Sequence, residues 1–402
     1  MRPLLSALLL AAHASPLGAQ APLRQTESDA YTLYQLLAPG SAKFRIVYEV
    51  TATTPGATHY FNPIRKGSIA SDESVFDRAT GKPLEFDIVG SDVARAGGVR
   101  ASDSSQRYIR VTLAHPVPPD PGEARVLIIK TYEDSASYFR RGDTLVFARP
   151  LGIKRNAILL PPGYELLTSS FPAQVIQDGE GNVAISFWNS TPSEAAVTLR
   201  ALPVHLARGT SWSVAARVPD RAHESSEVAY DLHSPETSTF DLSLDYTESQ
   251  PGKTTHVNSV LAGNRVSSAR GRNLDTGEEV AAEILEGEAI TRAGLDVRFE
   301  SPVPAAVVYR FPVVSAGSSI RLRMIETRID TAGYRLAGEE LVWRRSSSQP
   351  ANAVVLPLGW MLTNSSIPVV VSTLSSGRVR LDFVNPRPGV TDMLVTARRR
   401  VR

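Results

Sequence analysis

The chain has 402 residues, with 43 lysine and arginine residues against 41 aspartate and glutamate residues, and a formal net charge of +2. This near balance gives no reason to expect a nucleic-acid partner or an acidic membrane surface. The sequence has no cysteine, which excludes a disulfide framework and a lipid-anchored cysteine, so stability must come from packed cores.

Residues 1–20 have the pattern of a secretory signal peptide. Arg2 supplies a positive start, an apolar run from Leu4 to Ala12 follows, and small residues lead to a cleavage site after Ala19. The apolar run is too short to span a bilayer, and a retained N-terminal anchor is the alternative. We therefore expect a periplasmic or secreted bacterial protein without a transmembrane segment.

Alternation of apolar and polar residues dominates the rest of the sequence. Phe44, Ile46, Tyr48 and Val50, for example, alternate with more polar neighbours, which is typical of strands with one buried face. Only the segment Asp29–Leu37 is ambiguous, between a short entry helix and an edge strand. Many short strands without long helices predict an all-β protein of antiparallel β-sandwiches.

The second half of the chain repeats the first at an offset of 196 residues. Asn156-Ala157 recurs as Asn352-Ala353, and Phe44 recurs as Phe240. This repeat predicts two tandem, internally duplicated domains. We place domain one at residues 26–203, domain two at residues 227–399, and a linker or extra strand at residues 204–226.

Residues present in both copies have a structural interpretation. Asn189 and Asn385 follow strands and precede turns, where Asn side chains hydrogen-bond to the backbone. Leu160–Tyr164 and Leu356–Trp360 are interpreted as strands that end in a turn with an aromatic plug. In contrast, copy one carries ten additional residues within the stretch Ser91 to Arg107, whose Gly, Ala and Ser content predicts a mobile loop.

Copy one also carries charged side chains that copy two replaces by uncharged residues. Six of them form the candidate binding site: Arg65, Lys66, Asp72, Glu73, Lys154 and Arg155. Cations next to carboxylates can bind an anionic or hydroxyl-rich ligand, so one hypothesis places a polar site in domain one and a scaffold in domain two. The alternatives are an ordinary solvated salt-bridge surface or the interface with domain two.

Sequence motifs for catalysis are absent. There is no nucleophile elbow, no phosphate loop or dinucleotide fingerprint, and no pair of histidines with zinc-ligand spacing. We therefore predict no cofactor and no metal, and catalytic residues are unknown. Asp72 or Glu73 together with Glu133 or Asp134 leaves a glycosidase-like pair of carboxylates as an alternative.

These observations favour an exported, non-enzymatic binding or scaffolding protein of the bacterial envelope, with its ligand surface in domain one. Its partner would be an envelope protein or a glycan. The alternative is a hydrolase that acts on an envelope or extracellular polymer through carboxylates of domain one. A third hypothesis is an assembly protein that binds another protein through exposed sheet edges.

Overall fold

The structure is a computed structural model that describes residues 23–177, 180–203, 219–223, 226–295, 303–385, 387 and 389–400. The predicted signal peptide and most of the predicted linker lie outside these residues. In the described part of the chain the helical segments are short, namely α1 (Ser91–Ala96), α2 (Glu288–Arg292) and the 3-10 turn η1 (Pro235–Thr237). None of them is long and apolar enough to cross a bilayer.

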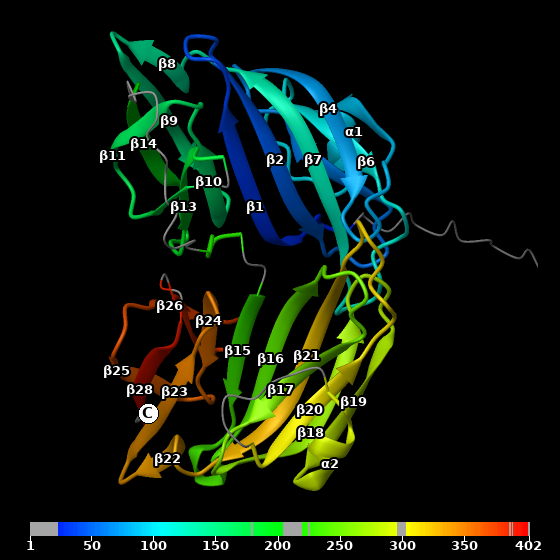
Figure 1. The fold of residues 1–402 in the computed structure, drawn as a ribbon, viewed down its shortest axis with the longest axis vertical. Coiled ribbons are helices and arrows are strands. Elements are labelled where there is room, and N and C mark those ends of the chain that lie inside the picture. Colours follow the sequence, from blue (N-terminus) through cyan, green and yellow to red (C-terminus); the bar gives the residue numbers. More distant parts are fainter. Residues whose placement is uncertain are drawn as a thin grey trace, which may run out of the picture.

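Two β domains follow one another, and the order of their strands repeats (Figure 1). The described residues of domain one form β1 (Glu27–Leu36), β2 (Lys43–Ala52), β3 (His59–Pro63), β4 (Ile69–Asp77), β5 (Phe86–Gly90), β6 (Arg107–Thr112), β7 (Ala124–Glu133), β8 (Tyr138–Arg141), β9 (Thr144–Leu151), β10 (Arg155–Leu159), β11 (Tyr164–Ser169), β12 (Gln174–Gln177), β13 (Val183–Trp188) and β14 (Ala195–Pro203).

Each strand of domain one has a counterpart fourteen places later in the strand order. The described residues of domain two form β15 (Ser226–Leu232), β16 (Thr239–Glu248), β17 (Thr255–Val260), β18 (Asn264–Asn273), β19 (Glu279–Glu286), β20 (Ala305–Arg310), β21 (Ile320–Asp330), β22 (Tyr334–Ala337), β23 (Glu340–Ser347), β24 (Ala351–Val355), β25 (Trp360–Ser365), β26 (Val370–Thr373), β27 (Val379–Val384) and β28 (Thr391–Arg399). The predicted internal duplication is thus visible strand by strand.

The main sheet of domain one has the order β12-β13-β10-β1-β2-β7-β4, and side chains of the smaller sheets β11-β14-β9-β8 and β3-β6-β5 share one hydrophobic core with it. Domain two has the order β17-β20-β19-β18-β21-β16-β15-β24-β27-β26, with β22-β23-β28-β25 as its second layer. These layers confirm the prediction of two tandem β-sandwiches. The sheets are not wholly antiparallel, however, because β1 pairs parallel with β10, and β15 with β24. Alternation of side chains does not reveal the direction of a neighbouring strand.

Two local predictions need correction. The segment Asp29–Leu37 is neither a helix nor an edge strand, since β1 lies between β10 and β2 and buries Tyr34 and Leu36. The stretch predicted to be a mobile loop contains α1, whose Ala94 is fully buried beside Phe61 and Tyr108. Its small residues permit close packing.

The shared asparagines and phenylalanines have the structural roles expected of them. The Asn189 side chain donates to the Ser193 carbonyl at 2.7 Å, and Asn385 donates to the Gly389 carbonyl at 2.9 Å. Phe44 and its counterpart Phe240 are completely buried in the two cores. Phe44 packs edge-on against the ring of Phe147 at 5.6 Å, an arrangement that aromatic pairs favour.

Each core phenylalanine is expected to support its own domain. Phe44→Ala and Phe240→Ala should each lower the free energy of unfolding by about 3 to 5 kcal/mol, because each leaves a cavity in a packed interior. Urea unfolding followed by tryptophan fluorescence measures this. Phe86→Ala is the matched control, since Phe86 is 36% exposed, and an equal loss in that variant would contradict the assignment of core anchors.

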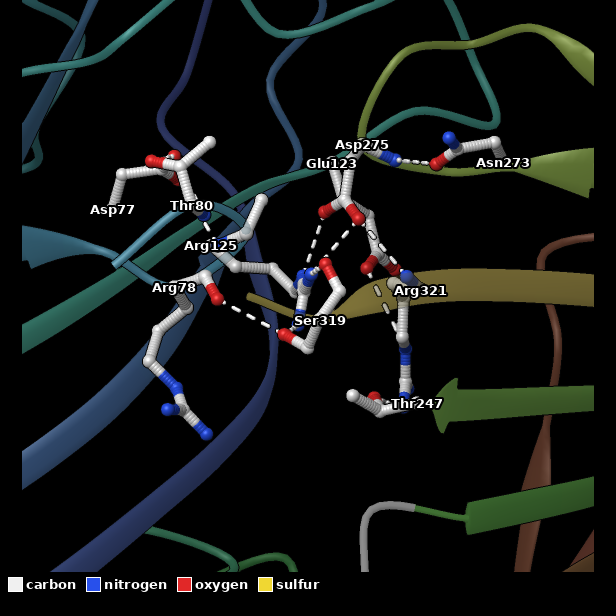
Figure 2. Close-up of polar contacts among 11 residues, drawn as sticks. Asp77, Arg78, Thr80, Glu123, Arg125, Thr247, Asn273, Asp275, Ser319 and Arg321 are labelled. Carbon is white, nitrogen blue, oxygen red and sulfur yellow. Dashed lines mark hydrogen bonds and ion pairs between the residues drawn. The ribbon is translucent and has the colours of Figure 1, made fainter. Parts of the chain in front are cut away.

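The domains meet through a buried ion pair (Figure 2). Arg125 of β7 donates Nε and Nη2 to the carboxylate of Asp275, in the turn after β18, at 2.6 and 2.8 Å. Both side chains are only 7% exposed. Arg321, the counterpart of Arg125 in domain two, donates its backbone N–H to the same carboxylate at 2.9 Å. One carboxylate therefore receives hydrogen bonds from both domains.

Main-chain bonds across the junction are nearly symmetric. The Glu123 N–H donates to the Leu274 carbonyl at 2.8 Å, from domain one to domain two. Its counterpart Ser319 donates its N–H to the Ala79 carbonyl at 3.0 Å, in the opposite direction. Counterpart segments thus contact each other across the junction, as in a two-fold interface between identical subunits.

Glycine in each turn permits this close approach. Gly81 has φ +71°, and a Cβ there would lie 2.8 Å from the Gly317 carbonyl oxygen. Its counterpart Gly277 has φ +75°, and a Cβ there would lie 2.9 Å from Cβ of Pro118. The left-handed backbone and the short distances both favour glycine.

The junction should couple the unfolding of the two domains. Asp275→Ala leaves the Arg125 guanidinium buried without its carboxylate, a change that typically costs about 3 to 5 kcal/mol. We expect one calorimetric transition in the wild type and two in the variant. Asp87→Ala is the control, because it removes an exposed pair with Arg110 and should change little. One transition in both variants would contradict the proposed coupling.

A cationic cleft in domain one as the candidate functional site

The structure distributes the six predicted site residues over several places. Arg65, Lys66 and Glu73 line one hollow of about 280 Å³. The Lys66 Nζ in addition forms an exposed ion pair with Asp103 at 3.1 Å. Asp72 lies in the bulge of β4 with φ 55°, exposed to solvent. The structure therefore brings three of the six together.

Lys154 and Arg155 lie at the domain junction instead. They line a separate hollow of about 260 Å³ together with residues of domain two. Arg155 is 2% exposed, and its Nη1 donates to the Ala222 carbonyl at 2.9 Å. Its guanidinium also lies 5.8 Å from the Trp188 ring centre. Arg155 thus holds the segment between the domains against domain one.

A larger cleft of about 720 Å³ lies in domain one and includes Arg65 in its lining. Three neighbouring strands of the main sheet form its floor, with Tyr34 from β1, Tyr48 from β2 and Lys130 from β7. Walls come from β3 and β9, which belong to the smaller sheets. The cleft therefore lies where the two smaller sheets flank one face of the main sheet.

Lys130 is the unusual side chain of this cleft. It is only 4% exposed, although lysine is almost never fully buried without a partner. Its Nζ donates to Oδ1 of Asn62 at 2.6 Å and lies 5.0 Å from the Tyr132 ring centre. No carboxylate among the described residues forms an ion pair with it. The ammonium group thus has one neutral acceptor and an aromatic ring as its surroundings.

Domain two shows a different solution at the equivalent position. The counterpart of Lys130 is Glu326, which is completely buried. Its carboxylate accepts hydrogen bonds from Arg328 at 2.7 Å, from Asn258 at 2.7 Å and from the Tyr309 hydroxyl at 3.1 Å. Domain two therefore neutralises this buried charge with its own side chains.

Two other cationic side chains, Arg149 and Arg65, lie near Lys130, and only one of them has a carboxylate that balances its charge. Arg149 of β9 lies 3.1 Å from the Asp134 carboxylate, and both side chains are buried. Arg65 donates Nη1 to the Pro150 carbonyl at 3.3 Å and forms no ion pair with a carboxylate of the described residues. Arg65 and Lys130 are therefore cations of the cleft that form no ion pair with a carboxylate in the described part of the chain.

Burial and the neighbouring Arg149 lower the pKa of Lys130 to about 7, and the Glu73 carboxylate opposes them in part. The charged amine loses hydration on burial, and a like charge nearby adds to that penalty. At neutral pH the side chain therefore exists both as an ammonium ion and as a free amine. A strongly shifted pKa in a cleft is typical of functional sites.

The sequence alone did not select Lys130 as a site residue. The signal was present, because Lys130 and Glu326 have opposite charges at the 196-residue offset. Only burial distinguishes this exchange from the many harmless charge changes on a surface. In the described residues, no three histidine, aspartate or glutamate side chains gather to hold a metal ion.

Comparison with known proteins gives weak likenesses. No family model and no curated protein sequence matches the chain. An M1 zinc metallopeptidase from Deinococcus radiodurans is similar with a TM-score of 0.31 and 10% identity, over 45% of this chain and 42% of that chain. The collagen adhesin of S. aureus gives a TM-score of 0.18 and 9% identity, over 81% and 88%. The match spans less than half of the peptidase, and such low scores assign no function.

Removal of the Lys130 charge should stabilise the protein. The pKa of Lys130 is about 7 in the folded state, against an ordinary value of 10.5, so the unfolded chain binds more protons between these values. Wild-type stability gains up to about 1.4 kcal/mol per pH unit from this group as the pH rises through that window. Lys130→Met should therefore be more stable than wild type, most clearly at pH 6, with a difference that shrinks by pH 10.

Urea unfolding of both proteins at pH 6, 8 and 10 checks this expectation. Lys82→Met is the control, since Lys82 is exposed and its removal should leave the pH dependence unchanged. A Lys130→Met variant that is less stable than wild type at every pH would show that the amine is structurally required.

Proposed function

We propose that the protein is an exported, non-enzymatic binding protein that takes up a small organic anion in the cleft of domain one. The observation that carries this proposal is the buried Lys130, which forms no ion pair with a carboxylate in the described part of the chain, whereas domain two compensates the equivalent position internally. The signal-peptide pattern of residues 1–20 supports export.

The energetic argument concerns the missing counter-charge. A buried ammonium ion costs several kcal/mol unless an anion and hydrogen bonds compensate it. A carboxylate or phosphate of a ligand would supply that compensation next to Lys130. Arg65 lines the same cleft and offers the guanidinium geometry that suits both kinds of oxyanion.

The rest of the cleft suits an apolar or ring-shaped portion of the ligand. Tyr34, Tyr48 and Phe61 line the cleft, and each is at least nine-tenths buried. Ligand sites combine apolar and aromatic walls with a few polar groups that fix orientation. An organic anion with a ring therefore fits this lining better than a bare inorganic ion.

The hydrolase alternative remains a hypothesis without a specific supporting contact. One of its carboxylates, Asp134, accepts hydrogen bonds from Ser68 and Ser137 and pairs with Arg149. These contacts occupy the carboxylate in the local structure. Turnover of a polymer that disappears in Asp72→Ala or Glu73→Ala would favour the hydrolase.

The proposal predicts selective binding of an aromatic anion. Pyridoxine 5′-phosphate carries a ring and a phosphate, and pyridoxine is the same ring without the charge. Calorimetric titration at pH 7 should show binding of the phosphate at least about tenfold tighter than that of pyridoxine, a difference of about 1.4 kcal/mol. Lys130→Met should remove this preference, and Lys82→Met should preserve it.

The affinity should also depend on pH in a defined direction. The anion binds the ammonium form, so the wild-type affinity should fall above pH 7 by up to about tenfold per unit. Arg65→Ala should weaken binding and keep this slope, because arginine stays charged. No binding of pyridoxine 5′-phosphate, or an affinity unchanged in Lys130→Met, would refute the proposed function.

A further inference from the structure

We infer that the Lys130 amine forms a reversible imine with an aldehyde group on the anionic ligand of the domain-one cleft. The inference rests on the proposed function, since it assumes that the same cleft holds the ligand. It goes further because it assigns a covalent step and a carbonyl-bearing ligand class to this site.

The surroundings of the amine favour this chemistry. Lysine becomes nucleophilic when it is desolvated in an apolar site or placed next to another cation, and Lys130 meets both conditions. Its side chain is 4% exposed, and Arg149 lies close enough to lower its pKa. Lys130 lines the cleft, so a ligand bound there lies next to this side chain.

No carboxylate of the described residues forms an ion pair with Lys130, and Glu73 acts on it only without such a contact. A carboxylate of the protein fixed beside the lysine would hold the proton on nitrogen and suppress attack. Asn62 instead accepts one N–H at 2.6 Å, which orients the nitrogen without demanding a charge. With a pKa of about 7, about half of the Lys130 side chains are neutral amines at neutral pH. The anionic group of the ligand has Arg65 as a second cation in the cleft, so its aldehyde is able to face the neutral form of Lys130.

The reaction balances without an oxidant or a reductant. The neutral amine attacks the carbonyl carbon, a proton moves from nitrogen to the former carbonyl oxygen, and loss of one water leaves a carbon–nitrogen double bond. Tyr132 lies beside the amine, 5.0 Å from Nζ to the ring centre. Burial raises the pKa of Tyr132, so its hydroxyl, which accepts a hydrogen bond from the Arg65 N–H at 3.1 Å, stays protonated.

Few lysines compete with Lys130, which makes the inference easy to test. The chain contains six lysines, at positions 43, 66, 82, 130, 154 and 253. Lys43 and Lys66 form exposed ion pairs with Glu133 and Asp103. Peptide mapping can therefore assign an adduct to one residue.

The experiment uses pyridoxal 5′-phosphate, an aromatic anion with an aldehyde, followed by borohydride reduction and mass spectrometry. With the probe below the protein concentration, we expect the reduced adduct on Lys130 at least about tenfold above that on any other lysine. Excess pyridoxine 5′-phosphate, which has no aldehyde, should protect Lys130. The site is mapped in the wild type, so the result does not depend on the folding of a variant.

Adducts spread over the exposed lysines, with Lys130 unmodified, would overturn the inference. Lys82→Met should retain the adduct on Lys130, and Lys130→Met should lose it without gaining another dominant site. Calorimetry separates the two proposals. If pyridoxine 5′-phosphate binds and requires Lys130 but the aldehyde forms no adduct there, the imine is refuted and the binding function stands. If neither occurs, both are refuted.

Discussion

A charged side chain inside a β-sandwich needs a counter-charge, and the two copies meet this need differently. Glu326 finds its partners in Arg328, Asn258 and Tyr309 within domain two. Lys130, at the equivalent position of β7, has the neutral Asn62. The asparagine is common to both copies, whereas the charge next to it has changed sign. Domain one thus presents an incomplete version of a network that domain two completes.

The duplication also explains why one copy is able to carry such a site. The Arg125–Asp275 pair and the reciprocal main-chain bonds join the domains through counterpart segments. A domain held in this way gains support from its neighbour, which offsets the cost of an imperfectly compensated interior. The stability that the junction contributes therefore offsets the free-energy cost of the buried lysine in the cleft.

Sequence patterns predicted the sandwiches, the duplication and the core phenylalanines, because alternation and repeats report burial directly. They misassigned β1, since the edge or centre of a sheet depends on pairing between distant segments. They also grouped Arg65 with Lys154 and Arg155, because neighbouring charges in copy one had uncharged counterparts. The structure separates these residues, and Arg155 holds the Ala222 carbonyl. A difference in charge between the copies shows only that a residue has been replaced. The burial of that residue shows whether the replacement affects stability.

Its burial also sets Lys130 apart from an ordinary core residue. Methionine or leucine would fill the same space without a desolvation penalty, so packing alone does not call for lysine there. A buried amine without an ion-paired carboxylate that lowers stability in the lining of a cleft is typical of sites where binding opposes stability. The same desolvation that penalises the ammonium ion releases the neutral amine near pH 7. One physical cause thus supports both the uptake of an anion and the covalent capture of a carbonyl.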